Sequence, residues 1–344
     1  MSSKPTRSQW RALYNAAIRL KELAPWEWMQ ETDIFGIKDP KSDQIGYISI
    51  MGQLGEHYAL SLYLNSEGFY GFWELQNGEN EIVLESFLEI PQLQLSFENE
   101  EELKDEDKKI IEDLGYTFNG EHEWPMFRSY KPGYAPWFLT AKEADFFKIA
   151  IEQSIDVAIA FQHDPSLLSV DDDDDKYLVR VKQKKDRKEV WTNTFIKIPD
   201  SEPLRIPIDY SEKTMESIKK KKKSNQMLEL DFSLFLSPIH DGPQPYYAYM
   251  LILMDAKSAE VIGHELLTQE PTREDMLGSL PQKVLELLTK LETRPSEIRI
   301  RSNILYQLLE DLADELDIYI LETNSLPCVN FFKEQFYKKF KPEE

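Results

Sequence analysis

The order of predicted elements after Gln226 is the feature that most constrains how this chain can fold. Three strand-like runs lie in succession between Gln226 and Leu267, separated by a loop rich in proline and glycine and by a short polar turn. Helical and strand-like runs then alternate. Strands joined by short loops pair antiparallel, whereas strands joined through a helix add in parallel by right-handed crossovers. This order predicts an α/β fold with a mixed sheet and flanking helices.

The first half of the chain predicts a separate α+β domain. Helix-period and strand-period runs follow one another there, and the capping pair Thr140 and Glu143 opens a helix that is apolar around much of its circumference. The segment 164–176 contains a proline and five consecutive aspartates, whose mutual repulsion favours an extended chain. We therefore predict an N-terminal α+β domain over residues 1–165 and a C-terminal α/β domain over residues 176–344.

The net charge of −22 limits the partners that the surface as a whole can bind. Such a surface repels phosphate backbones, so we do not expect nonspecific nucleic-acid binding. The chain has no apolar run of about 18 residues and no signal-peptide-like segment at its N-terminus, which predicts no membrane contact and a cytoplasmic location. The single cysteine, Cys328, excludes an intrachain disulfide and a zinc site built from a cysteine cluster.

The basic residues are concentrated in two runs. Between Lys176 and Glu189 there are seven basic and two acidic residues, and the strand-like runs on either side of Asp186–Lys188 predict a hairpin at the start of the second domain. The second run, Lys219–Lys223, consists of lysine alone. We expect a hairpin edge and a solvated helix end, and the alternative is a phosphate-binding patch.

An aperiodic aromatic stretch between residues 124 and 137 is the most unusual part of the sequence. Prolines fix much of its backbone, so its rings can form a rigid groove in which an arginine binds a carboxylate or phosphate. The candidate ligand-binding residues are Trp124, Arg128, Tyr130, Tyr134 and Trp137. The alternative is an irregular connection that covers the core, with the arginine bonded to backbone carbonyls.

Two aspartates in the strand-like runs are candidates for metal chemistry. Strand alternation puts Glu229, Asp231 and Ser233 on one face, which predicts the polar face of a half-buried strand. Asp255 ends the next run, where an aspartate readily caps the following turn. An active-site cleft requires the same alternation, so the pattern also allows a catalytic role.

The C-terminal half resembles the ribonuclease-H-like core of transposases and integrases. "LELDFSLF" looks like the first strand of that family, "YAYMLILMDAKSAEVIG" its second and third strands, and "EIRIRSN" and "KEQF" the segments that carry its second and third acids. The resemblance implies that Asp231 matches the first acid and Glu334 the third, while Ser302 occupies the second position. Because two-metal phosphoryl transfer needs closely spaced carboxylates, this substitution implies a degenerate site.

The whole chain also resembles a bacterial two-domain family of unknown function, through "IGYISIMGQLGEHYAL", "WPMFRSYKPGYAPWFLT" and "YYAYMLILMDAKSAEVIGHELL". We expect a noncatalytic binding or scaffold protein that needs no cofactor. One alternative is a divergent nuclease that holds Mg²⁺ or Mn²⁺ with Asp231, Asp255 and Glu334, which must then converge within about 5 Å. Another alternative is a sensor of small ligands or peptides built on the aromatic stretch. The sequence alone leaves the presence of a metal site open.

Overall fold

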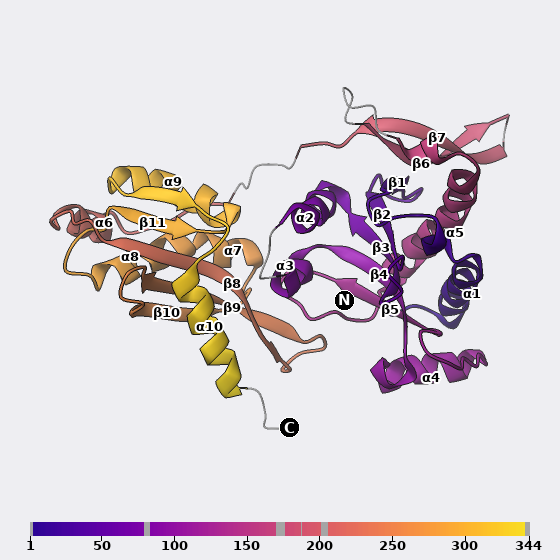
Figure 1. Cartoon of the computed structure of the whole chain (residues 1–344), viewed down its shortest axis with the longest axis horizontal. Coiled ribbons are helices and arrows are strands. Elements are labelled where there is room, and N and C mark those ends of the chain that lie inside the picture. The colour runs from indigo at the N-terminus through magenta and orange to yellow at the C-terminus, as the bar shows by residue number, and fades with distance from the viewer. Residues whose placement is uncertain (1–2, 79–82, 170–175, 187, 201–205, 341–344) are drawn as a thin grey trace. The chain divides into compact units, whose positions relative to one another are not determined.

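The chain forms two units, each built around one β-sheet (Figure 1). The computed structural model describes residues 3–78, 83–169, 176–186, 188–200 and 206–340. The first unit comprises Met1–Gly78 with Ser86–Ser201, and the second comprises Glu79–Glu85 with Glu202–Glu344. Both units combine helices with a sheet that contains parallel and antiparallel pairs, which confirms the predicted α/β class.

The first unit contains a seven-stranded sheet of order β5-β4-β3-β2-β1-β6-β7. Neighbouring strands are antiparallel, except that β1 and β6 are parallel. The strands are β1 (Phe35–Lys38), β2 (Ile45–Met51), β3 (Tyr58–Leu64), β4 (Gln92–Glu98), β5 (Trp124–Tyr130), β6 (Lys176–Lys185) and β7 (Lys188–Lys197). The helices are α1 (Arg7–Leu23), α2 (Asn65–Asn77), α4 (Asp105–Leu114) and α5 (Ala141–His163), with 3₁₀ turns at Pro25–Glu27, Glu100–Glu102 and Pro165–Leu168. Helix α3 (Val83–Glu89) is divided, because its residues up to Glu85 belong to the second unit and those from Ser86 onward to the first.

The two faces of this sheet carry different side chains because successive residues of a strand point to opposite sides. One face bears aliphatic residues such as Ile48 and Leu60, which pack into a core shared with α1 and α5. On the other face Tyr47 and Tyr63 pack against Phe69 of α2 and its neighbours. The capping box predicted at Thr140 is present at the start of α5.

The predicted hairpin forms, but it belongs to the first sheet rather than to the second domain. Lys185 pairs with Lys188 across the turn, and Val179 of β6 pairs with Gly36 of β1. A Cβ atom at Gly36 would lie 2.7 Å from the Val179 side chain, so glycine allows this close approach. The division between the units therefore lies near residue 201 rather than at 164–176. The five aspartates of the predicted linker lie outside the described residues.

The second unit contains a five-stranded sheet of order β10-β9-β8-β11-β12. As predicted from the order of elements, the first three strands are antiparallel, and β11 and β12 add in parallel to β8. The strands are β8 (Met227–Ile239), β9 (Tyr246–Asp255), β10 (Val261–Leu267), β11 (Glu297–Ile300) and β12 (Tyr319–Glu322). The helices are α6 (Glu212–Lys219), α7 (Arg273–Gly278), α8 (Leu280–Thr289), α9 (Asn303–Glu315) and α10 (Pro327–Phe340).

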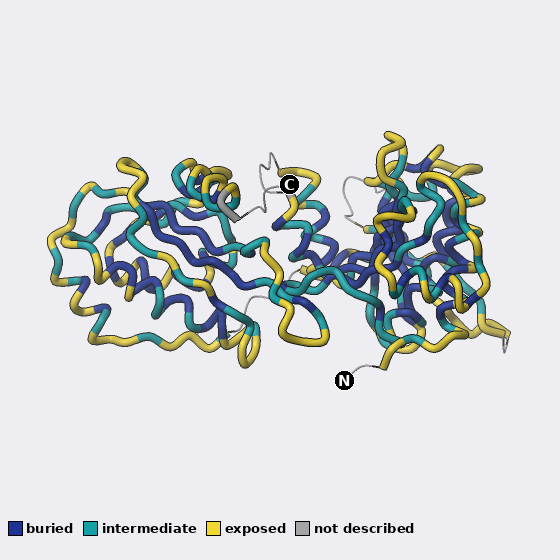
Figure 2. The backbone as a smooth tube through the Cα atoms, turned by 90° about the horizontal axis from the view of Figure 1, so that it is seen from below, coloured by how far each residue is buried: buried dark blue, intermediate teal, exposed yellow. Residues whose placement is uncertain are grey.

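Helices cover both faces of this second sheet. On one face Met250 and Ile252 of β9 pack against Leu326 and Val329 at the start of α10. The opposite face carries Glu265 of β10, which binds Lys283 of α8 at 2.6 Å. Figure 2 shows strands of each sheet running through the buried part of their unit. Residues of β8 are therefore enclosed on either side, which sets the environment of Asp231.

The lysine run 219–223 is partly bonded into the second unit. Lys221 donates to the carbonyls of Leu288, Thr289 and Leu291, where α8 ends and its last carbonyls lack helical partners. Lys219 binds Glu315, and Lys223 binds Asp317 at 2.8 Å. Three of the five lysines thus have structural roles, in contrast to the predicted solvated run.

Among the helices within the described ranges, none combines the length and apolar character that crossing a bilayer requires.

Candidate functional site

Asp231 lies in the middle of β8 beneath α10 and is only 3% exposed. The predicted alternation is correct, since Asp231, Glu229 and Ser233 share the face that α10 covers. The prediction that this strand is only half-buried, with its polar face toward solvent, is wrong. Glu229 is as deeply buried as Asp231, because α10 excludes water from this side of the sheet. A charged carboxylate in such a place requires close partners.

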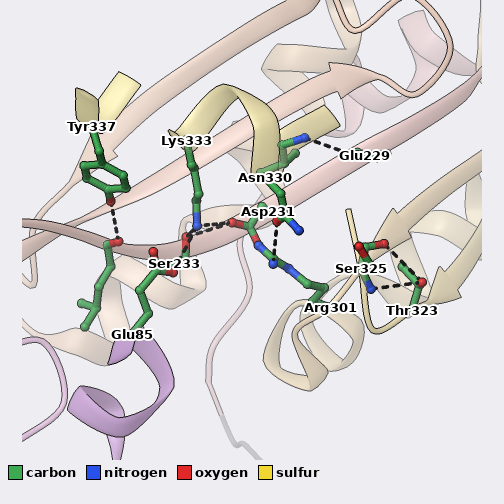
Figure 3. Close-up of polar contacts among 12 residues, drawn as sticks. Glu85, Glu229, Asp231, Ser233, Arg301, Thr323, Ser325, Asn330, Lys333 and Tyr337 are labelled. Atoms are coloured by element: carbon green, nitrogen blue, oxygen red, sulfur yellow. Dashed lines mark hydrogen bonds and ion pairs between the residues drawn. The ribbon is translucent and has the colours of Figure 1, made fainter. Parts of the chain in front are cut away.

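Two cationic side chains provide these partners (Figure 3). Nη2 of Arg301, which follows β11, lies 2.9 Å from one carboxylate oxygen of Asp231. Nζ of Lys333, on α10, lies 2.8 Å from the other oxygen. The Ser233 hydroxyl donates to that second oxygen at 2.8 Å. Both oxygens of the Asp231 carboxylate are thus engaged by groups of the protein itself.

Lys333 and Arg301 make further bonds that close the cluster. Nζ of Lys333 lies 3.1 Å from Glu85 and also contacts the Ser233 hydroxyl. Nη1 of Arg301 donates to the Asn330 side chain at 2.9 Å. Two carboxylates and two cations balance in charge, and the ammonium group of Lys333 lies between two carboxylates and a hydroxyl. We refer to Asp231, Glu85, Lys333 and Arg301 as the buried charge cluster.

The environment keeps Asp231 and Lys333 ionised. Burial alone would raise the pKa of Asp231, but the nearby Lys333 and Arg301 outweigh it and hold the pKa below its ordinary value. Burial alone would lower the pKa of Lys333, but Asp231 and Glu85 hold it above its ordinary value. Each group therefore supports the charged form of the other, which is the arrangement expected of a structural ion pair.

Glu229 engages the start of α10 rather than a ligand. Its carboxylate accepts a hydrogen bond from the backbone N–H of Val329 at 3.0 Å. An anion is favoured there because the first N–H groups of a helix lack partners and carry partial positive charge. Burial and the neighbouring Glu229 raise the pKa of the Cys328 thiol, so Cys328 is poorly suited to act as a nucleophile.

The predicted metal triad does not assemble. Asp255 pairs with Leu228 in the β8–β9 register, so it points to the face opposite Asp231 and lies three residues, about 10 Å, further along the strands. It caps the following turn as expected, accepting the N–H groups of Lys257 and Ser258. Burial opposes ionisation of Asp255, but hydrogen bonds from Gln226 and these N–H groups lower its pKa to about 2.

The other two predicted positions point away from Asp231 as well. The Glu334 side chain is 69% exposed and lies 3.9 Å from Lys338. Ser302 caps α9, accepting a hydrogen bond from the Leu305 N–H. The residues that do reach Asp231 are Arg301 and Lys333, each one position before the predicted one. Sequence reasoning missed both, although each basic residue was visible beside the predicted acid position.

A divalent cation does not fit the buried charge cluster as it stands. Oxygen-ligated Mg²⁺ and Ca²⁺ need ligands at about 2.0–2.6 Å, and the Lys333 ammonium already lies against the oxygens of Asp231 and Glu85. Across the described part of the chain, no group of three or more histidine, cysteine, aspartate and glutamate side chains is placed to hold a metal ion. The metal site that the nuclease alternative requires is therefore not formed by the predicted residues.

The aromatic stretch of the first unit is more regular than predicted, and its arginine is not available to a ligand. Residues Trp124–Tyr130 form β5, an edge strand paired with β4. Arg128 is 4% exposed and binds both carboxylate oxygens of Asp107 of α4, at 2.9 and 2.5 Å. It also donates to the Phe127 carbonyl and lies 4.9 Å from the Phe138 ring centroid.

The rings of this stretch contact side chains of the same unit. Trp124 packs against Phe118, and the hydroxyl of the buried Tyr130 donates to Gln94. The Lys104 ammonium lies 4.3 Å from the Trp137 ring centroid. Tyr134 is half-buried in the turn that follows β5. The structure thus favours core packing for this stretch over the predicted groove, and Arg128 binds the buried Asp107 carboxylate in addition to the backbone carbonyl of Phe127.

The buried charge cluster makes the stability of the second unit depend on pH at both extremes. The pKa of Asp231 is lowered on folding, so its contribution is present above its unfolded value of about 3.9 and is lost as the pH falls through the folded value. The pKa of Lys333 is raised, so its contribution is present below about 10.4 and is lost as the pH rises through the folded value. Thermal unfolding followed by circular dichroism should show a plateau between these limits.

Asp231→Asn should flatten the acid limb of this profile, and it should also weaken the alkaline limb, because the Asp231 carboxylate is the largest of the influences that hold the pKa of Lys333 up. Glu334→Gln provides the control, because the exposed Glu334 lies outside the cluster. An acid limb of unchanged depth in the Asp231→Asn protein would contradict the assignment of this limb to Asp231.

Comparisons with known proteins match two separate regions of the chain. A search of curated proteins found no match to the chain. Residues 10–180 match a family model described as a domain of unknown function, DUF7309, and residues 214–337 match a second such model, DUF6930. The first match ends within β6 and the second begins within α6, so the two models fall on the two structural units.

Proposed function

We propose that this chain is a bacterial, cytoplasmic protein that binds or organises other molecules without catalysing a reaction. The second unit, on this view, has a ribonuclease-H-like core whose cation position is filled by its own side chains. The order β10-β9-β8-β11-β12, with three antiparallel strands followed by two parallel additions, supports the resemblance. The observation that carries the proposal is the pairing of both Asp231 oxygens with Lys333 and Arg301.

The chemistry of phosphoryl transfer explains why this pairing argues against a nuclease. Two-metal catalysis places two cations about 4 Å apart, where they stabilise the attacking and leaving oxygens. A lysine ammonium neutralises carboxylates, but it has no vacant coordination position that could hold a water or a phosphate oxygen. The cluster is also covered by α10, with Lys333 itself only 5% exposed. Its residues are therefore suited to holding the fold together rather than to meeting a substrate.

A cleavage assay with the full chain tests this proposal. Single-stranded and duplex DNA and RNA are incubated with the protein and either Mg²⁺ or Mn²⁺, with Asp231→Asn run in parallel. We expect no hydrolysis by either protein above a metal-only blank. We also expect neither metal to raise the melting temperature of the second unit, because the Lys333 ammonium lies against the carboxylate oxygens that would have to bind the metal. Metal-dependent cleavage that Asp231→Asn abolishes would overturn the proposal.

A further inference from the structure

The hairpin formed by β6 and β7 extends well beyond the sheet to which it belongs. Each strand has ten residues. Among the described residues, the other neighbour of β6 is β1, which has four residues and pairs through Gly36 and Ile37 with Val179 and Arg180. Beyond Arg180 the two strands pair with each other alone, up to the pair Lys185 and Lys188. The hairpin end is thus a two-stranded ribbon (Figure 1).

The base of this ribbon is anchored and its end is exposed. Arg180 donates to Gln153 of α5, and Leu178 lies in the core of the first unit. The described residues 182–186, 188 and 189 are all exposed. A two-stranded ribbon without further packing is marginally stable in water, and this one has little apolar surface of its own at its end. The exposed end of the ribbon therefore has charge, rather than apolar surface, with which to bind a partner.

The charge of the ribbon is opposite in sign to that of the chain. Residues 176–189 contain seven basic and two acidic residues, whereas the whole chain carries −22. Lys182 is engaged with Glu189 at 2.5 Å. Lys185 and Lys188 make no ion pair with any residue that the structure describes. The end of the ribbon therefore presents cations that folding has not neutralised.

These cations lie on both faces of the ribbon. Residues directly opposite each other in an antiparallel pair share a face, and successive residues alternate between faces. Lys185 and Lys188 are opposite each other and so share one face, while Lys184, opposite Glu189, lies on the other. A flat acidic surface would meet only one of these faces. A groove with negative charges on both walls would meet both.

The distance from the body of the unit allows the ribbon to act independently of the overall negative charge. Lys185 lies five positions after Arg180, which corresponds to about 17 Å along a strand. The Debye length is about 8 Å at physiological ionic strength, so charges in the body of the unit are largely screened at the ribbon end. The expectation that the acidic surface as a whole avoids nucleic acid thus does not extend to this element.

We propose that the end of the β6–β7 ribbon binds duplex DNA by entering the major groove, with Lys184, Lys185 and Lys188 contacting phosphates on its two walls. The major groove of B-form DNA is about 12 Å wide and admits a two-stranded β-ribbon. The major groove of A-form RNA is deep and narrow, so an RNA duplex offers no equivalent site. This inference concerns the first unit and does not rest on the buried charge cluster.

Fluorescence anisotropy with the full chain and a labelled DNA duplex of arbitrary sequence tests the inference. We expect binding in the range of about 10–100 µM at about 100 mM salt, weakening about sixfold when the salt is doubled, because three phosphate contacts release about three counterions. Replacing Lys184, Lys185 and Lys188 together with glutamine should weaken binding at least about tenfold and remove most of this salt dependence. These side chains are exposed, so circular dichroism should show an unchanged fold.

A matched control removes the same charge elsewhere. Lys213, Lys220 and Lys222 are exposed lysines of the second unit, and their replacement with glutamine should leave DNA binding unchanged. Glu189→Gln should strengthen binding about twofold by releasing Lys182 from its ion pair. An RNA duplex of the same sequence should bind at least about fivefold more weakly than the DNA.

The remaining outcomes decide against the inference. Absence of DNA binding would overturn it, as would equal binding by the ribbon variant or a loss confined to the control variant. Binding of polyglutamate but not of DNA would replace the proposed partner with an acidic protein. Because this assay measures binding and the cleavage assay measures hydrolysis, either proposal can fail while the other stands.

Discussion

Replacing Lys333 with methionine is expected to lower the free energy of unfolding of the second unit by about 3–5 kcal/mol, because it leaves the buried Asp231 and Glu85 short of a cation. Methionine has a similar length and keeps most of the packing of α10, so the loss reports on charge. Asp231→Asn in the Lys333→Met background should recover part of the loss, with a coupling of at least about 1 kcal/mol.

The distribution of tryptophan makes this measurement specific. All seven tryptophans lie in the first unit, so their fluorescence follows that unit while far-ultraviolet circular dichroism follows both. Lys333→Met should shift the denaturant transition seen by circular dichroism and leave the fluorescence transition in place. Glu334→Gln, at the next position but exposed, should change stability by less than about 0.5 kcal/mol. Equal effects of the two substitutions would contradict the role given to Lys333.

Replacing Arg128 with methionine is expected to cost the first unit about 3–5 kcal/mol for the same physical reason. The side chains of Arg128 and Asp107 are each 5% exposed, and the guanidinium binds the carboxylate through two nitrogens. Without Arg128 the carboxylate is buried without a countercharge between α4 and β5. The fluorescence transition should therefore move to lower denaturant concentration.

A neighbouring surface pair supplies the control for this second prediction. Lys131 binds Glu143 at 3.1 Å, but its side chain is 44% exposed, so Lys131→Met should cost less than about 1 kcal/mol. A similar loss in both variants would show that the site is merely sensitive to substitution. An Arg128→Met protein of normal stability would contradict this structural role and would support the prediction that the Arg128 guanidinium binds a ligand.

Much of the second unit could be predicted from its sequence because its elements are short and regularly punctuated. Three strand-like runs joined by short connections, followed by helix–strand alternation, allow few arrangements, and the observed strand order and parallel additions agree. The cap at Thr140 in the first unit was also visible, because a capping box depends on residues close together in the sequence. Local chemistry is what a single sequence conveys best.

The buried charge cluster could not be predicted, because its geometry depends on contacts between distant segments. Asp231 comes from strand β8, Arg301 from the residue after β11, and Lys333 from helix α10. A shift of one residue decides whether an acid or a base faces inward. On α10, Lys333 points to the sheet while Glu334, about 100° further around the helix, points to solvent. The depth at which Asp231 lies follows from α10 covering β8, which strand alternation alone does not reveal.

The prediction that the β6–β7 hairpin belongs to the second domain was wrong for a related reason. Composition suggested a boundary at the aspartate run, but sheet membership depends on which free edge a strand meets in space. The short strand β1 leaves an edge that β6 occupies through Gly36 and Ile37. A parallel contact of this kind joins residues about 140 positions apart and leaves no local signal. The connecting aspartates gave no information on which sheet receives the next strand.

The position of Lys333 on α10 has a consequence for how the second unit is made in the cell. Lys333 lies 100 residues after Ser233. Strand β8 therefore leaves the ribosome about 5–20 s before α10, whose Lys333 neutralises the Asp231 carboxylate. During that interval the carboxylates of Asp231 and Glu229 have to stay hydrated, and the nascent sheet cannot close over them. Folding of this unit can therefore finish only after Lys333 has been synthesised. Ribosome pausing between these segments would prolong the exposure of an unfinished sheet to chaperones and proteases.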